Sequence, residues 1–417
     1  MAEGGLTGTA GPGAMRLLRR NNRMARLTGA VLVSSIGDPL SLTISLVLLY
    51  AATGSPVAIA GAYMAQMAGV LAVGGLLGAV TDRVDRRRLI VGLEIARWVL
   101  VASLPLATLV SVFALYPALM LLGATESLVE PARQAAAAEL VDQHEVGTAN
   151  SLLLTALSLG QAIGFAIAGL ALVHLSNPRL LYFGDAVTFL AAGLLVLTLG
   201  GLGGGVRTVR LQGGLGRAWR VPGVKPLLIM AGATVFFVGM LNPALLPLSY
   251  LLAANGPGAY SVVQICLIAG LFGGSLLAAR ISTGLRLPAM AVGTALFAIG
   301  IFGIWASPGL WPAILGFALS GIGNAVYSVT NISALMQVAN TANRGTVMAS
   351  RFTITQATKA LGLGAGAAVT AALGPRSSFA LIAAGLLAVG VAFSLYLSLR
   401  AVATGRPRAQ GEAATKT

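Results

Sequence analysis

Apolar residues occur along this chain in long runs that short polar links separate. A helix needs about 20 mainly apolar residues to cross a bilayer, and about twelve runs reach that length. They cover 28–50, 57–80, 89–110, 113–136, 148–172, 179–200, 226–252, 259–281, 288–308, 311–337, 346–372 and 377–399. The runs are too long for barrel strands and do not alternate between apolar and polar positions. The pattern predicts an all-α integral membrane protein with about twelve transmembrane helices.

The composition agrees with a membrane protein of many spans. The 417 residues are 57% hydrophobic and only 9% charged, whereas a soluble domain of this size carries far more charge. The single cysteine, Cys266, excludes an internal disulfide and a cysteine metal cage. His144 and His174 both fall in predicted links. We therefore expect no metal site and no cofactor.

The formal net charge of +15 is unevenly distributed along the chain. Nearly all of the 27 Lys and Arg residues lie in the two tails, in the middle link and in the links that follow even-numbered runs. Such an asymmetry predicts that both termini and the middle link are cytoplasmic. The basic residues are thus a signal of topology, and we expect no nucleic-acid partner.

Two halves of the chain resemble each other. The longest polar stretch, 200–225, divides the runs equally, and segments 145–172 and 343–373 align at a constant offset. Asp38-Pro39 in the first run also matches Asn242-Pro243 in the seventh. A duplicated unit of this kind is typical of transporters that alternate access. The predicted organisation is a cytoplasmic tail, a six-helix bundle, a cytoplasmic linker, a second, pseudo-symmetric six-helix bundle and a cytoplasmic tail, at 1–27, 28–200, 201–225, 226–400 and 401–417.

The link after the second run contains four arginines and two aspartates, and it reads GAVTDRVDRRRL (78–89). It resembles the loop signature of the major facilitator superfamily, G-x-L-x-D-R-x-G-R-R. Asp85 stands at the position where this family usually has glycine. With EPARQAAAAELVDQ (130–143) and GDAVTFL (184–190), this variant is similar to the macrolide-efflux-like and enterobactin-exporter-like branch. The antiporter motif of the fifth span is altered, because Phe165 replaces its proline and Ala168 a glycine. The resemblance implies the major facilitator fold in the cytoplasmic membrane of a prokaryote.

The same resemblance implies a conformational latch at the cytoplasmic face. The family's matching carboxylate, here Asp82, caps the N-terminus of span eleven, where free backbone N–H groups favour an anion. Arg86 is expected to pair with an acid at the end of span four, for which Glu130 is the candidate. The alternative is that these arginines only fix the topology. The candidate latch residues are Gly78, Asp82, Arg83, Arg86, Glu130 and Arg133.

Ionisable side chains inside spans are costly and therefore suggest function. The candidates for proton coupling or substrate binding are Asp38, Glu126, Lys359 and Asn242. Spans one, four, seven and ten line the central cavity in this family. Each acid could instead form a static pair or hydrogen bond, and Lys359 is expected to partner a carboxylate.

Other polar and small residues within spans are expected to be structural or to line the cavity. Glu94 and Arg97, three residues apart, favour a structural pair on one helix, and Asp185 on a peripheral span is expected to be structural too. Possible cavity residues, for which interhelical hydrogen bonds are the alternative, are Gln161, Asn324, Tyr327, Asn331 and Gln356. Small residues at four-residue spacing favour close helix packing, here at a sliding interface between the halves, and they are Gly160, Gly164, Gly169, Gly362 and Gly366.

These observations predict a secondary active transporter that works as a monomer in the lipid bilayer. We expect proton-coupled efflux of a small amphipathic or cationic compound, such as a drug, natural product or siderophore. A lipid or lysolipid flippase, an uptake symporter of the same fold and a non-transporting sensor are the alternatives. No set of catalytic groups converges at one depth, so an enzyme is not expected, and no P-loop motif for ATP is present.

Overall fold

The computed structural model describes residues 12–74, 85–201, 218–253, 256, 258–339 and 343–403. Within these ranges eleven helices are long and apolar enough to cross a membrane. The last of them is two helices joined at Gly374, whose φ of 83° is a left-handed conformation that favours glycine. The predicted all-α membrane fold is confirmed.

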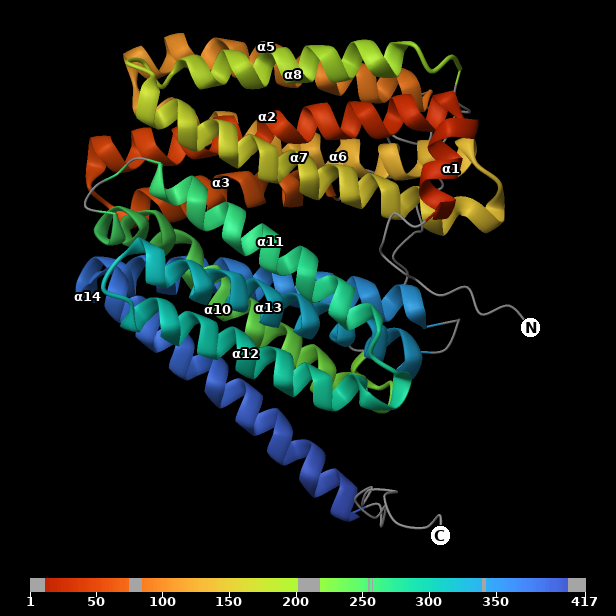
Figure 1. The fold of residues 1–417 in the computed structure, drawn as a ribbon, viewed down its shortest axis with the longest axis vertical. Helices are drawn as coiled ribbons and strands as arrows, with labels where there is room; N and C mark the ends of the chain where they lie inside the picture. The colour runs from red at the N-terminus through yellow and green to blue at the C-terminus, as the bar shows by residue number, and fades with distance from the viewer. Residues whose placement is uncertain are drawn as a thin grey trace.

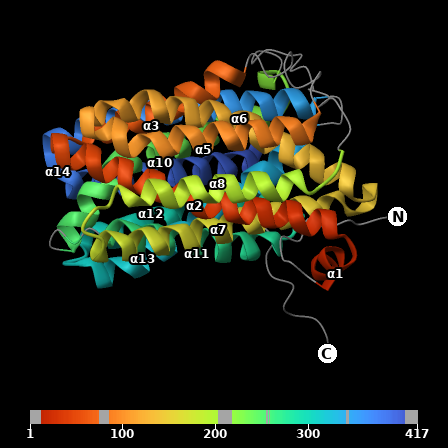
Figure 2. The same cartoon turned by 90° about the horizontal axis from the view of Figure 1, so that it is seen from above.

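Figure 1 shows the helices as two groups that lie one above the other. The N-terminal half contains α2 (Asn22–Thr53), α3 (Pro56–Gly74), α5 (Arg86–Val110), α6 (Leu115–Leu140), α7 (Val146–His174) and α8 (Leu180–Leu197). The C-terminal half contains α10 (Val224–Leu252), α11 (Ala259–Ala279), α12 (Arg286–Ala306), α13 (Leu310–Val338) and α14 (Arg344–Ala403). A short helix, α1 (Pro12–Arg20), precedes the first half and lies across the end of the bundle, against α2 and α7 (Figures 1 and 2).

Corresponding helices pack in the same way in the two halves. In the first half α2 packs against α7 and α8, α3 against α6, and α5 against α8. In the second half α10 packs against α14, α11 against α13, and α12 against α13 and α14. The halves meet where α7 contacts α11 and where α3 contacts α14 and α10. This arrangement agrees with the internal repeat in the sequence.

The two ends of the bundle are distinguished by the chain termini. We call the end where α2 begins and α14 ends the terminal end, and the opposite end the far end (Figure 1). The halves touch toward the far end, where the ring of Tyr50 lies 5.9 Å from that of Tyr250. There Tyr260 also meets Phe165 at a centroid distance of 6.2 Å and the hydroxyl of Tyr63 at 3.2 Å. Aromatic contacts therefore join the halves on that side.

The predicted glycine faces are used for close packing, but mostly not at the boundary between the halves. A Cβ at Gly164 would lie 2.2 Å from the carbonyl oxygen of Ile36 on α2, and one at Gly362 would lie 2.1 Å from that of Phe236 on α10. Gly160 and Gly366 also face α2 and α10, respectively. The expectation that these four line a sliding interface is wrong, because they join helices of the same half.

The fifth glycine does lie between the halves. A Cβ at Gly169 on α7 would lie 2.8 Å from the Cβ of Ser261 on α11. Of the five glycines predicted to line the boundary between the halves, Gly169 is therefore the only one that lies there.

Arginines at the terminal end bind carbonyl groups at the C-terminus of α8 and just beyond it. Arg23 donates to Leu199 at 2.7 Å and to Gly201 at 3.0 Å, and Arg26 donates to Thr198 at 2.9 Å. Arg87 donates to the carbonyl oxygen of Leu197. The C-terminal carbonyls of a helix lack intrahelical partners and carry partial negative charge. These basic residues therefore cap α8 in addition to any role in topology.

Candidate functional site

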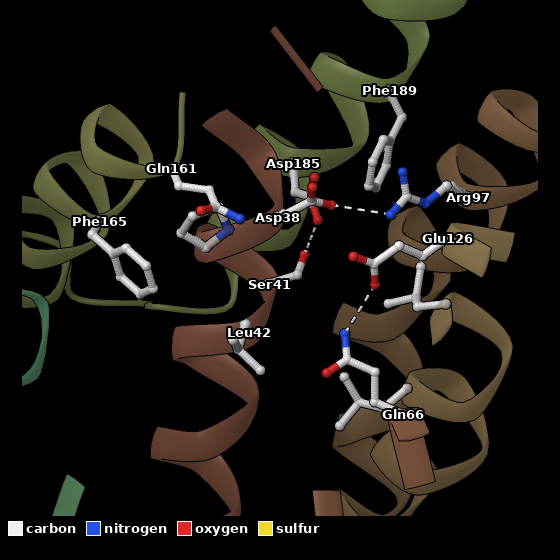
Figure 3. Close-up of a pocket in the computed structure, with 13 residues that line it drawn as sticks. Asp38, Ser41, Leu42, Gln66, Arg97, Glu126, Gln161, Phe165, Asp185 and Phe189 are labelled. Atoms are coloured by element: carbon white, nitrogen blue, oxygen red, sulfur yellow. Dashed lines mark hydrogen bonds and ion pairs between the residues drawn. The ribbon is translucent and has the colours of Figure 1, made fainter. Parts of the chain in front are cut away.

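Four ionisable side chains converge in the middle of the N-terminal half. They are Asp38 on α2, Arg97 on α5, Glu126 on α6 and Asp185 on α8, and all line a cavity of about 120 Å³. Figure 3 shows them pointing toward one another from four helices. Because charged groups are costly within a membrane span, such a convergence indicates a functional site.

Asp38 and Arg97 form the ion pair at the centre of this cavity. Nη2 of Arg97 donates to Oδ1 of Asp38 at 3.2 Å, and the guanidinium lies 4.5 Å from the ring centroid of Phe189. The side chain of Arg97 is 4% exposed, and that of Asp38 is 33% exposed. Arg97 is thus fixed on two sides, whereas Asp38 still faces the cavity.

Asp185 lies next to this pair and is 1% exposed. The hydroxyl of Ser41 donates to Oδ2 of Asp185, and that of Thr188 lies 3.4 Å from Oδ1. Gly37 permits this arrangement, because a Cβ there would lie 2.0 Å from Oγ1 of Thr188 and 2.1 Å from Oδ1 of Asp185. A residue with a side chain at position 37 would push Asp185 away from α2.

Glu126 also lines a second cavity, whose walls come from both halves. Nε2 of Gln66 lies 3.5 Å from Oε2 of Glu126, and both residues line both cavities. The second cavity, of about 330 Å³, is also lined by Glu130 from α6 and by Gln356 and Lys359 from α14. Among the described residues no carboxylate lies within ion-pair distance of Lys359. The direct partner expected for Lys359 is therefore not found, although it faces the two acids.

The remaining predicted cavity residues divide into two groups. Gln161 lines the first cavity and Gln356 the second, as expected. Tyr327 instead donates to the carbonyl of Met230 at 3.4 Å, and Asn331 donates to that of Leu227 at 3.1 Å. Both therefore make the interhelical hydrogen bonds that were the alternative.

Two further predicted polar residues lie outside both cavities. Asn242 donates to the carbonyl oxygen of Val238 on its own helix at 3.1 Å. Asn324 is half-buried on α13. Neither lines either cavity, so the structure does not bring Asn242 to the group with which it was predicted to act.

The predicted pair between Glu94 and Arg97 is wrong. Glu94 accepts from Arg133 on α6 at 2.5 Å, while Arg97 binds Asp38. Side chains three residues apart differ in direction by about 60° around a helix, and here this difference lets Glu94 face α6 while Arg97 faces α2. Arg133, proposed as a latch residue, is therefore buried in a pair between α5 and α6.

The predicted partner of Arg86 is also wrong. Arg86 forms its ion pair with Glu139, nearer the terminal end of α6, and Glu130 accepts from Gln134 at 2.9 Å. Asp85, the departure from the family's glycine, accepts a hydrogen bond from the backbone N–H of Arg88 at 3.0 Å and so caps α5.

Three other latch candidates, Gly78, Asp82 and Arg83, lie outside the described residues. The contact proposed between Asp82 and the start of span eleven therefore remains a prediction.

Sequence reasoning missed two members of the central cluster. Arg97 and Asp185 were expected to be structural, because spans three and six are peripheral in the family. The signal was nevertheless present, since an ionisable residue within a span is a candidate wherever the span lies. Ser41 and Gln66 carried no signal beyond their polarity.

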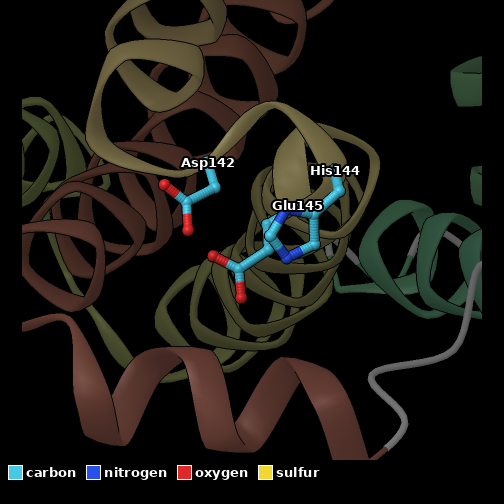
Figure 4. Close-up of side chains that lie close together, drawn as sticks. All are labelled: Asp142, His144 and Glu145. Carbon is cyan, nitrogen blue, oxygen red and sulfur yellow. The ribbon is translucent and has the colours of Figure 1, made fainter.

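A different group of possible metal ligands lies between α6 and α7. Ligand atoms of Asp142, His144 and Glu145 lie within 4.8 Å of one another (Figure 4). Arg20 already donates to both carboxylate oxygens of Glu145 at 2.8 Å, and Asp142 and His144 are exposed. An arginine that neutralises one ligand disfavours a cation, so these three residues give no basis for assigning a metal site.

Comparisons with known proteins identify the family. The family model described as Major Facilitator Superfamily matches residues 27–285 and again residues 227–417. No curated protein matches by sequence.

Solved structures of similar fold include several transporters. The nucleoside transporter NupG has a TM-score of 0.74 at 13% identity, with 89% of this chain and 99% of that chain covered. An autoinhibited peptide transporter of the POT family has a TM-score of 0.71 at 14% identity, with 95% of this chain and 99% of that chain covered. A bacterial homologue of the iron transporter ferroportin, in an inward-facing state, has a TM-score of 0.69 at 14% identity, with 90% of this chain and 98% of that chain covered. These identities show likeness of fold alone, whereas the family model covers nearly the whole sequence. The chain therefore belongs to the major facilitator superfamily, whose members are multi-pass membrane transporters.

Proposed function

We propose that this protein exports a small cationic amphipathic compound in exchange for protons. The observation that carries the proposal is the excess of acids in two cavities that share Gln66 and Glu126 in their walls. Asp38, Glu126, Glu130 and Asp185 line them together with two cations, Arg97 and Lys359. An acidic cavity attracts cations and gives protons a place to bind, which is what exchange of the two requires.

The walls of the cavities suit a substrate with an apolar part. Phe165, Phe189 and Leu122 line the first cavity, and Tyr63 and Met67 line the second. Aromatic faces attract cations as well as apolar groups. A hydrophilic cation without an apolar part would lose hydration water in these cavities and gain few contacts in return.

Movement of the two halves relative to each other would expose this site first to one side of the membrane and then to the other. Residues of both halves line the second cavity, and aromatic contacts join the halves toward the far end. If the basic terminal end is cytoplasmic, as the arginine distribution predicts, this arrangement corresponds to an inward-facing state. A cytoplasmic cation would then enter from the terminal end and leave after the far-end contacts separate.

Ethidium transport by the purified protein in liposomes tests this proposal. With an acidic lumen, exchange for outflowing protons would make the vesicles accumulate ethidium above the external concentration. Asp38→Asn would abolish accumulation, because its pair with Arg97 is at the centre of the cavity. Asp142→Asn, which removes an exposed acid far from both cavities, is the control and would accumulate ethidium normally.

The alternatives predict different results in the same vesicles. A symporter would accumulate ethidium only when the proton gradient is reversed. A flippase would move a fluorescent lysolipid between leaflets without a proton gradient. Either result, or normal accumulation by Asp38→Asn, would contradict the proposal.

A further inference from the structure

We infer that Asp185 carries the coupling proton, an inference that rests on the exchange proposed above. Two acids lie side by side in the first cavity, and their surroundings differ. Asp38 is 33% exposed along its side chain and holds Arg97 at 3.2 Å. Asp185 is 1% exposed, and none of the described cationic side chains lies within ion-pair distance of it.

The contacts of Asp185 suit a group that gains and loses a proton. Its carboxyl group meets the hydroxyls of Ser41 and Thr188. An isolated buried carboxylate is so costly that it normally takes up a proton. The Ser41 hydroxyl can donate to the charged form and accept from the protonated form. The Thr188 hydroxyl donates to the backbone carbonyl oxygen of Asp185 at 2.7 Å, so toward the carboxyl group it serves as an acceptor for the protonated form.

The charged and titratable groups around Asp185 come from three helices. Asp38 faces it from α2, Arg97 and, further along the helix, Glu94 come from α5, and Tyr182 lies on α8 itself. Arg97 already bonds Asp38 and lies over Phe189. None of the described cations is therefore paired with Asp185, and the charge of this carboxylate is the one most readily exchanged for that of a substrate.

Exchange then follows from a simple balance of charge in the cavity. When a cation enters, the O–H bond of Asp185 breaks and the proton leaves to cavity water, so the total charge of the cavity is unchanged. When a proton returns to Asp185, the cavity loses the negative charge that held the cation. Asp38 stays paired with Arg97 throughout, and Glu126 extends the acidic surface toward the second cavity.

Proton release on binding tests this inference directly. Ethidium is added to the purified protein in weakly buffered detergent with a pH indicator, and bound dye is measured by fluorescence anisotropy. The wild type is expected to release about one proton for each ethidium that binds, as the balance of charge requires. Asp185→Asn is expected to release none, while Asp142→Asn behaves as the wild type. Release by Asp185→Asn equal to that of the wild type would overturn the inference and leave the proposed exchange standing.

A second variant covers the case that Asp185→Asn does not fold, which size-exclusion chromatography shows. Ser41→Ala keeps the acid but removes its hydroxyl partner. It is expected still to release one proton per ethidium, with the midpoint of the pH profile shifted. A profile that coincides with the wild type would show that Asp185 is not the group that releases the proton.

Infrared spectroscopy gives an answer that needs no substrate. At neutral pH the wild type is expected to show the C=O stretch of a protonated carboxylic acid, which Asp38→Asn keeps and Asp185→Asn loses. A wild type that binds no ethidium would contradict the proposed function, and this band would still decide whether Asp185 holds a proton. If Asp185→Asn keeps the band, the inference is wrong.

Discussion

Two ion pairs within the spans of the N-terminal half differ in their exposure. Glu94 and Arg133 are 0% and 5% exposed along their side chains, and neither lines the described cavities. Asp38, by contrast, is one-third exposed and faces the cavity with Arg97. We propose that the first pair stabilises the fold and that the second takes part in transport.

The stability role predicts a large asymmetry between single and double substitutions. Glu94→Leu alone leaves Arg133 buried without a partner and is expected to destabilise the protein by about 3–5 kcal/mol. Adding Arg133→Met replaces the whole pair by apolar groups and is expected to recover most of that loss. Thermal unfolding in detergent measures both. A double variant as unstable as the single one would show that packing, rather than charge, is lost.

A surface pair provides the control for this comparison. Arg20 pairs with Glu145, and its side chain is 62% exposed. Arg20→Ala is expected to change the unfolding free energy by less than about 1 kcal/mol, because water screens exposed pairs.

The charged side chains that line the second cavity are expected to affect the affinity for ethidium. Lys359→Gln removes a positive charge and is expected to strengthen ethidium binding, while Glu126→Gln is expected to weaken it. A unit charge about 8–16 Å away contributes about 1–2 kcal/mol at an effective dielectric constant of about 20. That corresponds to about tenfold in the dissociation constant. Equilibrium titration measures it, and changes of the same sign in both variants would contradict a role for charge.

At the scale of helices, backbone contact at glycine joins the members of each half. Gly362 on α14 lies against Phe236 on α10, and Gly164 on α7 lies against Ile36 on α2. Small residues matter in a bilayer because association there depends on close packing rather than on burial from water. Close contacts at glycine therefore hold the helices of each half together.

Two glycines of α14 allow a matched test of this packing. Gly362→Ala would place a Cβ 2.1 Å from a backbone oxygen, and we expect a loss of about 1–3 kcal/mol from overpacking. Gly364, two residues away, has nothing within 4 Å, and Gly364→Ala is expected to be neutral or slightly stabilising. Melting temperatures compare them. Equal melting temperatures would contradict a packing role for Gly362.

At the scale of the whole molecule, the fold was largely predictable from the sequence. Run length and small-residue spacing reflect the bilayer itself, so they predict the number of spans and close helix packing. The repeat between residues 145–172 and 343–373 predicted two similar halves. The partners of the glycines were not predictable, because spacing shows that a face is smooth but does not show which helix lies against it.

The candidate site was only partly predictable, for a related reason. Asp38 and Glu126 were found because a charge within a span is conspicuous. Arg97 and Asp185 were not placed at the cavity, because their positions depend on how α5 and α8 are rotated, which a single sequence does not reveal. Which carboxylate faces which guanidinium is a property of tertiary packing.

If the protein works by alternating access, the two halves move as rigid bodies around the acidic cavity. Spin labels across the halves test it, placed in a Cys266→Ser background. The pair Gly147→Cys and Gly284→Cys reports on the terminal end, and Ser111→Cys with Pro308→Cys reports on the far end, all at exposed positions. Distances by double electron–electron resonance are compared in liposomes at acidic pH and at alkaline pH with ethidium. Between these conditions the account predicts that one distance shortens while the other lengthens. Distances that stay constant, or that change in the same direction at both ends, would contradict it.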